Sequence, residues 1–277
     1  MAKPPAPTND ILTTGLAERI IPLEVRPVVD LATSARLNAI ARLGGLENHD
    51  GRALERFAEL QGRRRELLIY MVERAARHIK TWRASGFDGS LFVSLPPQLI
   101  ADRTLATSFD VISKGQGIAQ TAFTVLVPQA EYLRGGSDAL AAMWRLRKAG
   151  CGVAMFIDIK AVSKFGRLGE HPFSAIAFGG HHAWKRLKTI GPGKLGATGS
   201  WLGWGESLGL KRIACGINDE SERETARLYG FSLGEGMHFA DYMSARSFMG
   251  EGTTAPASPN AEAGLPPPPV VVSLKRA

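Results

Sequence analysis

Cysteines and long apolar runs are scarce in this 277-residue sequence. Its two cysteines, Cys151 and Cys215, are too few for a disulfide framework or a thiolate metal site. No apolar run approaches the roughly 18 residues of a transmembrane helix, and the polar, proline-containing start has no signal-peptide core. We therefore expect a reduced, cytoplasmic protein with no membrane span.

Acidic residues are outnumbered by basic ones, with 26 Asp and Glu against 34 Lys and Arg, for a net charge of +8. The cations gather in clusters such as residues 63–65 and 185–188. Such clusters usually form a solvated helix face, and the alternative is an anionic partner such as a nucleotide, an acidic protein surface or nucleic acid. No helix-turn-helix, zinc-finger or RNA-binding signature is present, so we expect no sequence-specific binding of nucleic acid.

Both ends of the chain have the composition of tails. The sequence predicts a flexible N-terminal segment over residues 1–17 and a disordered Pro- and Ala-rich tail over residues 250–277. Residues 18–249 remain for one domain, and a single α/β barrel needs roughly 250 residues.

Strand-like and helix-like stretches alternate through this domain. The predicted strands are Ile20–Val29, Arg36–Leu43, Leu91–Leu95, Thr121–Val127, Gly152–Asp158, Ser174–Phe178, Lys211–Cys215 and one that begins at Phe231–Leu233. The predicted helices are Arg52–Ala84, Ala101–Ser113, Ser137–Ala149, Ala183–Leu187, Gly199–Leu208 and Glu220–Tyr229. Repeated strand–helix units indicate a parallel sheet, and about eight strands close it into a barrel with its chemistry at the strand C-terminal ends.

The order of these segments resembles the EAL domain, a modified TIM-like (β/α)8 barrel that hydrolyses cyclic di-GMP. The stretch LEVRPVVDLATSARLNAIARL is similar to the family's opening, a Gln-Pro strand followed by a Glu-Ala-Leu-Leu-Arg strand. LFVSLPPQLI resembles its Asn-Leu-Ser strand, and KRIACGINDESERETARLYGFSLGEGMHF resembles Ala-Glu-Gly-Val-Glu, the next helix and the Gln-Gly strand. The resemblance covers about residues 18–243 and implies an α/β barrel whose first strand is antiparallel.

The resemblance also implies that most functional residues of the family are replaced. Positions of its metal ligands, other strand-end acids and catalytic lysine fall on Asn38, Ser94, Leu126, Gln129, Phe156, Ile157, Ala177, Gly179, Cys215 and Asn218. Asp158 follows the paired-aspartate positions, and Glu235 stands at the glutamine of the last strand. Arg42 matches the arginine of the opening motif and is retained.

The polar residues at the predicted strand ends define a vestigial ligand pocket. Its members are Asn38, Arg42, Ser94, Gln129, Asp158, Cys215, Asn218 and Glu235. Two acids on non-adjacent strands cannot hold two divalent metals, and no lysine on the sixth strand can orient a water. We therefore expect no catalytic residues and no metal or other cofactor; Mg²⁺ or Mn²⁺ would be expected only in an active phosphodiesterase. Arg42 inside a barrel would need a carboxylate or phosphate partner, and Asp158 or Glu235 could supply a carboxylate from within the chain.

Other conspicuous residues have simpler interpretations. His181 and His182 are interpreted as polar residues at a helix start, because adjacent histidines point in different directions. The stretch GPGKLGATGSWLGWG lacks Walker spacing and is interpreted as a connection. Cys215 is interpreted as a buried small residue, although a reactive thiol is the alternative.

The sequence therefore favours a catalytically inactive EAL-like domain in bacteria that acts as a signalling or regulatory module by binding another protein. The first alternative is a cyclic di-GMP receptor that does not hydrolyse its ligand, and the second is an active phosphodiesterase. The resemblance also implies a homodimer through a stretch from about Ser163 to Leu187.

Overall fold

The computed structural model describes residues 9–159, 171–180, 182–191 and 197–249. The predicted tail at 250–277 and His181 lie outside these ranges. So do residues 1–8 and parts of the glycine-rich connection and of the predicted dimer stretch. In the described part, no helix has the length and apolar character needed to cross a membrane.

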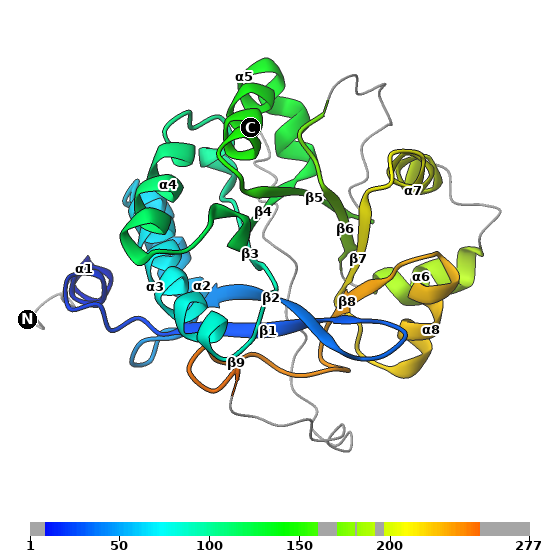
Figure 1. The fold of residues 1–277 in the computed structure, drawn as a ribbon, viewed down its shortest axis with the longest axis horizontal. Coiled ribbons are helices and arrows are strands. Elements are labelled where there is room, and N and C mark those ends of the chain that lie inside the picture. The colour runs from blue at the N-terminus through cyan, green and yellow to red at the C-terminus, as the bar shows by residue number, and fades with distance from the viewer. Residues whose placement is uncertain (1–8, 160–170, 181, 192–196, 250–277) are drawn as a thin grey trace, which may run out of the picture.

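The strands form a closed barrel, as the sequence predicts (Figure 1). Its strands are β1 Leu23–Asp30, β2 Arg36–Leu43, β3 Leu91–Ser94, β4 Phe123–Pro128, β5 Gly152–Asp158, β6 Ala175–Gly179, β7 Lys211–Cys215 and β8 Leu233–Glu235. They follow one another in the order β2 to β8, and β1 closes the ring by pairing with both β8 and β2. Strand β1 is antiparallel to both neighbours, which confirms the expected orientation of the first strand, whereas β2 to β8 are parallel.

Helices surround this ring of strands on the outside (Figure 1). They are α1 Asn9–Ala17, α2 Gly51–Leu60, α3 Arg64–Ala84, α4 Leu105–Gln116, α5 Gln129–Lys148, α6 Ala183–Ile190, α7 Ala197–Ser207 and α8 Glu220–Leu228. Short 3₁₀ turns at Pro97–Leu99 and Gln120–Ala122 and a two-residue strand, β9 Met243–Ser244, complete the described elements.

The helices differ from the sequence prediction most clearly in three places. The predicted helix from Arg52 to Ala84 is two helices, because Gly62 adopts a left-handed φ of +68° between α2 and α3. Helix α5 runs from Gln129 to Lys148 with a kink at the non-helical Gly136, so the predicted helix from Ser137 is its second part and the part before the kink was not predicted. Residues 9–17, expected to be flexible, form α1, whose Leu12 is fully buried.

The barrel interior is filled by apolar side chains from alternating strand positions. Val28, Phe92, Leu126, Ala154, Phe156, Ala177, Ile213 and Leu233 form one buried cluster, and Ile40 packs against it. A larger cluster lies between the strands and the outer helices. The interior is therefore a packed core, and binding chemistry is confined to the two ends of the barrel.

Helix α2 follows β2 after a short connection at residues 44–50 and lies at the C-terminal end of the barrel. Asp50 caps it by accepting a hydrogen bond from the Ala53 backbone N–H at 2.7 Å. Gly51 lies against the Leu43 carbonyl, where a side chain would not fit. This close approach places the first turn of α2, with Arg52 and Glu55, beside the strand ends.

Candidate functional site

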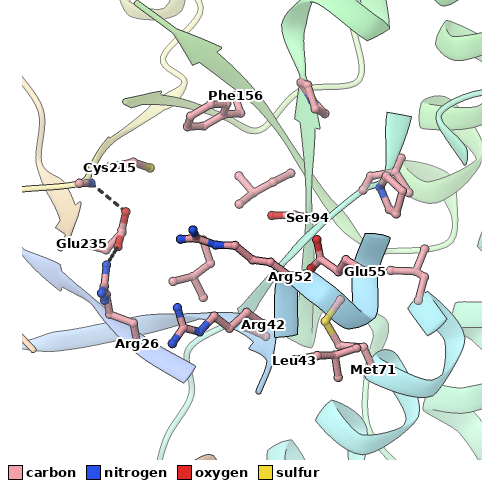
Figure 2. Close-up of a pocket in the computed structure, with 18 of the residues that line it drawn as sticks. Arg26, Arg42, Leu43, Arg52, Glu55, Met71, Ser94, Phe156, Cys215 and Glu235 are labelled. Carbon is pink, nitrogen blue, oxygen red and sulfur yellow. Dashed lines mark hydrogen bonds and ion pairs between the residues drawn. The ribbon is translucent and has the colours of Figure 1, made fainter. Parts of the chain in front are cut away.

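A cavity of about 290 Å³, here named the mouth cavity, lies at the C-terminal ends of the barrel strands (Figure 2). The strands contribute five polar side chains to its lining: Arg26, Arg42, Ser94, Cys215 and Glu235. Ile40, Leu126 and Phe156, which belong to or pack on the inner core, close its floor. Figure 2 shows Arg52 extending from α2 into the cavity.

A buried ion pair joins β1 to β8 at this end of the barrel. Arg26 Nη1 lies 3.2 Å from Glu235 Oε2, and the side chains are 4% and 8% exposed. The other carboxylate oxygen, Oε1, accepts a hydrogen bond from the Gly216 backbone N–H at 2.9 Å (Figure 2). Both oxygens of Glu235 are therefore bonded to protein groups.

Further contacts hold the Arg26 guanidinium in this position. Its Nη2 lies 3.2 Å from the sulfur of Met237 and 3.3 Å from Asp241 Oδ1, and its Cζ lies 4.2 Å from the centre of the Tyr242 ring. Burial is the largest single influence and would lower the pKa of Arg26, but the charge and hydrogen bond of Glu235, together with Tyr242 and Asp241, outweigh it and raise the pKa. Arg26 is thus a permanent buried cation.

Arg42 lies in the mouth cavity, but its partner differs from the expected ones. Its Nε donates to Glu24 Oε2 at 2.8 Å, across the antiparallel β1–β2 pair, and not to Asp158 or Glu235. Its guanidinium also lies 3.7 Å from the centre of the Tyr242 ring, a cation–π contact. The side chain is 40% exposed, so a second anion can still approach it.

The charge of the mouth cavity is mixed, with a positive excess. Four arginines line it, Arg26, Arg42, Arg52 and Arg64, together with three glutamates, Glu55, Glu131 and Glu235. Each glutamate faces an arginine: Glu55 lies 3.5 Å from Arg64, and Glu131 lies 3.4 Å from Arg134. Burial raises the pKa of Glu55, and Arg64 opposes the rise. The three carboxylates come from α2, α5 and β8 and do not converge.

Cys215 ends β7 with a buried side chain that is 8% exposed. Burial and the neighbouring charge of Glu235 both raise the pKa of its thiol. A thiol with a raised pKa stays protonated at neutral pH and is a poor nucleophile. This agrees with its interpretation as a buried small residue.

Asn218 lines the cavity mainly as part of the start of α8. Its side-chain amide donates to the Gly216 carbonyl at 3.0 Å and to Glu222 Oε2 at 3.2 Å. Asp219 caps the same helix by accepting from the Glu222 backbone N–H at 2.8 Å. The Asn218 side chain therefore stabilises the beginning of α8.

Three residues of the expected pocket do not line the mouth cavity. Asn38 lies at the opposite end of the barrel. It precedes Arg42 by four residues on β2, and four residues of a strand span roughly 13 Å. Gln129 is 3% exposed within the first turn of α5. Asp158 ends β5, and its carboxylate lies against Gly180. Gly180 has a φ of +113°, and a side chain at that position would collide with the Asp158 carboxylate.

The donor set does not fit the Mg²⁺ or Mn²⁺ that the resemblance implies for an active enzyme. Among the described residues, no three His, Cys, Asp or Glu side chains converge closely enough to hold a metal ion. Divalent ions of this kind need several oxygen ligands from one side of the site. Of the strand residues described, Glu235 is the one carboxylate that lines the mouth cavity, and it is already bonded through both oxygens.

Several cavity residues were not anticipated from the sequence. Arg26 is the clearest of these omissions. It is the single cation in a strand of mostly apolar residues. A charged residue is buried in such a strand only with a partner, and this could have indicated its role. Arg64 belongs to the cluster at residues 63–65, which was interpreted as a solvated helix face, and Arg52 and Glu55 come from α2 and had been given no role. Tyr242 had no comparable signal.

Comparison with known proteins gives the family and the fold. The model of the EAL domain matches residues 12–242. The PaMucR phosphodiesterase in complex with c-di-GMP is similar with a TM-score of 0.72 and 19% identity, over 86% of this chain and 98% of that one. No curated protein matches significantly.

Two further structures have the same fold. The FimX EAL domain from Pseudomonas aeruginosa, bound to c-di-GMP, gives a TM-score of 0.68 and 15% identity over 87% of this chain and 97% of that one. An EAL domain protein from Listeria monocytogenes gives a TM-score of 0.66 and 14% identity over 89% of this chain and 97% of that one.

Proposed function

The chain belongs to the EAL domain family, and from this premise we propose that it is a member that does not hydrolyse cyclic di-GMP and acts by binding. The observation that carries the proposal is the donor set of the mouth cavity. Within the described ranges, Glu235 is the only carboxylate that a strand contributes to this cavity, and Arg26 and the Gly216 N–H occupy both of its oxygens. Metal-activated hydrolysis of a phosphodiester needs several free oxygen ligands on converging side chains.

The buried guanidinium of Arg26 supports the same proposal. A permanent cation 3.2 Å from Glu235 repels a divalent ion from the end of β8. The end of β7 offers the protonated thiol of Cys215, which is a weaker metal ligand than a carboxylate for Mg²⁺. The direct test is a hydrolysis assay with cyclic di-GMP and excess Mg²⁺ or Mn²⁺, with the PaMucR phosphodiesterase as the positive control.

We take a protein partner as the first candidate for what the domain binds, in signalling or regulation within the bacterial cytoplasm. A silent domain of a signalling family retains its fold as a recognition surface, and the net charge of +8 favours an acidic partner surface. Affinity capture with the full chain tests this candidate, provided that the captured protein binds the purified domain at a defined stoichiometry.

A receptor for cyclic di-GMP that does not hydrolyse it is the second candidate. The mouth cavity favours it through its four arginines and the cation–π contact of Arg42 with Tyr242 at 3.7 Å. The PaMucR and FimX structures named above are complexes with c-di-GMP. Titration calorimetry without metal separates this candidate from the first, because a receptor binds the dinucleotide alone.

A further inference from the structure

A second cavity lies at the N-terminal ends of the barrel strands, opposite the mouth cavity, and is here named the basal cavity. Its volume is about 330 Å³, within the range of roughly 300–1,000 Å³ that small-molecule sites span. It lies next to the starts of β3, β4, β5 and β7, with Ser90, Thr124, Gly152 and Lys211 in its lining.

Cations from three different elements line the basal cavity. Arg83 comes from the last turn of α3, Arg147 from the last turn of α5, and Lys211 is the first residue of β7. Among the lining residues that the structure describes, Asp88 is the only carboxylate, so three cations and one anion leave an excess of two positive charges. Like charges brought together by separate elements repel unless an anion lies between them.

The protein does not neutralise this excess within the described residues. Asp88 already accepts a hydrogen bond from Arg83 Nη1 at 3.2 Å, and its side chain is 96% exposed. Arg147 Nη1 donates to a neutral group, the Cys151 carbonyl, at 3.3 Å. Across the described part of the chain, neither Arg147 nor Lys211 forms an ion pair.

The neutral groups of the lining also present donors. The Oδ1 atom of Asn38 accepts the Ser90 backbone N–H at 3.0 Å and the Ser90 hydroxyl at 3.1 Å. A backbone N–H can only donate, so this contact fixes which end of the Asn38 amide is oxygen. The two N–H groups of the Asn38 amide have no acceptor among the described residues and remain available to a ligand.

We propose that the basal cavity binds a small molecule through a phosphate group. Every unused group named above is a hydrogen-bond donor, and the phosphate group of a monoester offers three strong acceptor oxygens. A phosphate monoester carries a charge of about −1.5 to −2, which matches the excess of two positive charges, whereas a single carboxylate offsets only one. The proposal does not depend on whether the mouth cavity is catalytic.

Orthophosphate is the probe for this site. We expect it to raise the melting temperature of the full chain at constant ionic strength, relative to sodium chloride, and to give a saturable calorimetric titration. Lys211→Gln and Arg147→Gln should each weaken the affinity by about tenfold, the value of one charge-assisted hydrogen bond. Lys148→Gln, an equal charge loss on an exposed neighbour outside the cavity, should leave it unchanged.

Further variants test whether phosphate binds in the basal cavity rather than in the mouth cavity. Arg52→Gln removes an arginine of the mouth cavity and should leave phosphate binding intact, and Lys211→Arg should retain it by preserving the charge. The proposal is overturned if phosphate has no effect beyond chloride, or if Arg52→Gln removes binding while Lys211→Gln does not. It is also overturned if all charge-removing variants weaken binding alike, or if a polyglutamate peptide binds at Lys211 and Arg147 while phosphate does not.

Discussion

Arg26 and Glu235 form an ion pair of 3.2 Å between β1 and β8, and neither side chain is more than 8% exposed. Glu235 stands where the Gln-Gly motif that β8 resembles has its glutamine. The pair places a cation and a fully bonded carboxylate at the end of the barrel where a metal would need free ligands.

This pair predicts strong coupling in a double-mutant cycle. Arg26→Gln leaves the buried carboxylate of Glu235 without its cation and should lower the free energy of unfolding by about 3–5 kcal/mol. Glu235→Gln should cost less, because Arg26 keeps its contact with the exposed carboxylate of Asp241 at 3.3 Å. The double variant should recover most of this loss, because two amides can hydrogen-bond without a buried charge. Urea unfolding measures all four proteins, and simple addition of the two single costs would contradict the coupling.

The C-terminal end of the described chain should contribute measurably to stability. Phe248 is 1% exposed, and its ring centre lies 4.8 Å from that of Trp82 and 5.3 Å from that of Phe87. Phe248→Ala should cost about 3–5 kcal/mol, the usual loss for a large buried ring. Met249→Ala, one residue away and 37% exposed, is the matched control. Equal effects of the two variants on chemical unfolding would show that Phe248 is not packed as described.

His78 should make the stability depend on pH. Burial lowers its pKa, and the charges of Arg74, Arg246 and Arg77 add to the effect. The unfolded chain, with a histidine pKa of about 6.5, therefore takes up the proton first as the pH falls. The contribution of His78 to the free energy of unfolding is complete above about pH 6.5. It is lost as the pH falls towards the lowered pKa of His78 in the folded protein.

His78→Gln should therefore reduce the stability difference between pH 7.5 and pH 5.5. Some difference should persist, because burial also lowers the pKa of His171. Denaturant unfolding of both proteins at the two pH values measures the change. An unchanged difference in the variant would show that His78 does not contribute to it.

Cyclic di-GMP should not bind the domain at low-micromolar concentration. Glu24 already bonds Arg42, and Leu126 and Phe156 offer no hydrogen bonds from the cavity floor. Arg42→Ala should consequently change stability and not ligand binding. Calorimetry that finds a tight complex, lost in Arg42→Ala, would place the receptor candidate before the protein-binding candidate.

The sequence predicted the barrel well because its strands are apolar and sharply bounded. Strands β2, β5 and β7 have the predicted limits Arg36–Leu43, Gly152–Asp158 and Lys211–Cys215. The helices were harder to predict, because apolar spacing continues across Gly62 although its backbone ends one helix before the next begins. Helix α1 depends on tertiary burial of Leu12, which composition does not reveal.

The candidate site was predicted only in part. Arg42, Ser94, Cys215, Asn218 and Glu235 line the mouth cavity, because strand ends meet at one end of a parallel barrel. Motif position alone could not place Asn38, whose four-residue distance from Arg42 along one strand puts it at the other end. The partners of Arg26 and Arg42 depend on the antiparallel pairing of β1, since that pairing sets Glu24 opposite Arg42.

Metal-dependent hydrolysis of cyclic di-GMP tests the central claim most directly. The purified full chain is incubated with the dinucleotide and excess Mn²⁺ or Mg²⁺, and the loss of the dinucleotide is followed by chromatography. The PaMucR phosphodiesterase is assayed in parallel as the positive control. The donor set around Glu235 predicts no turnover with either metal, although the positive control consumes its substrate. Turnover by this chain that requires the metal and stops on chelation would contradict the claim.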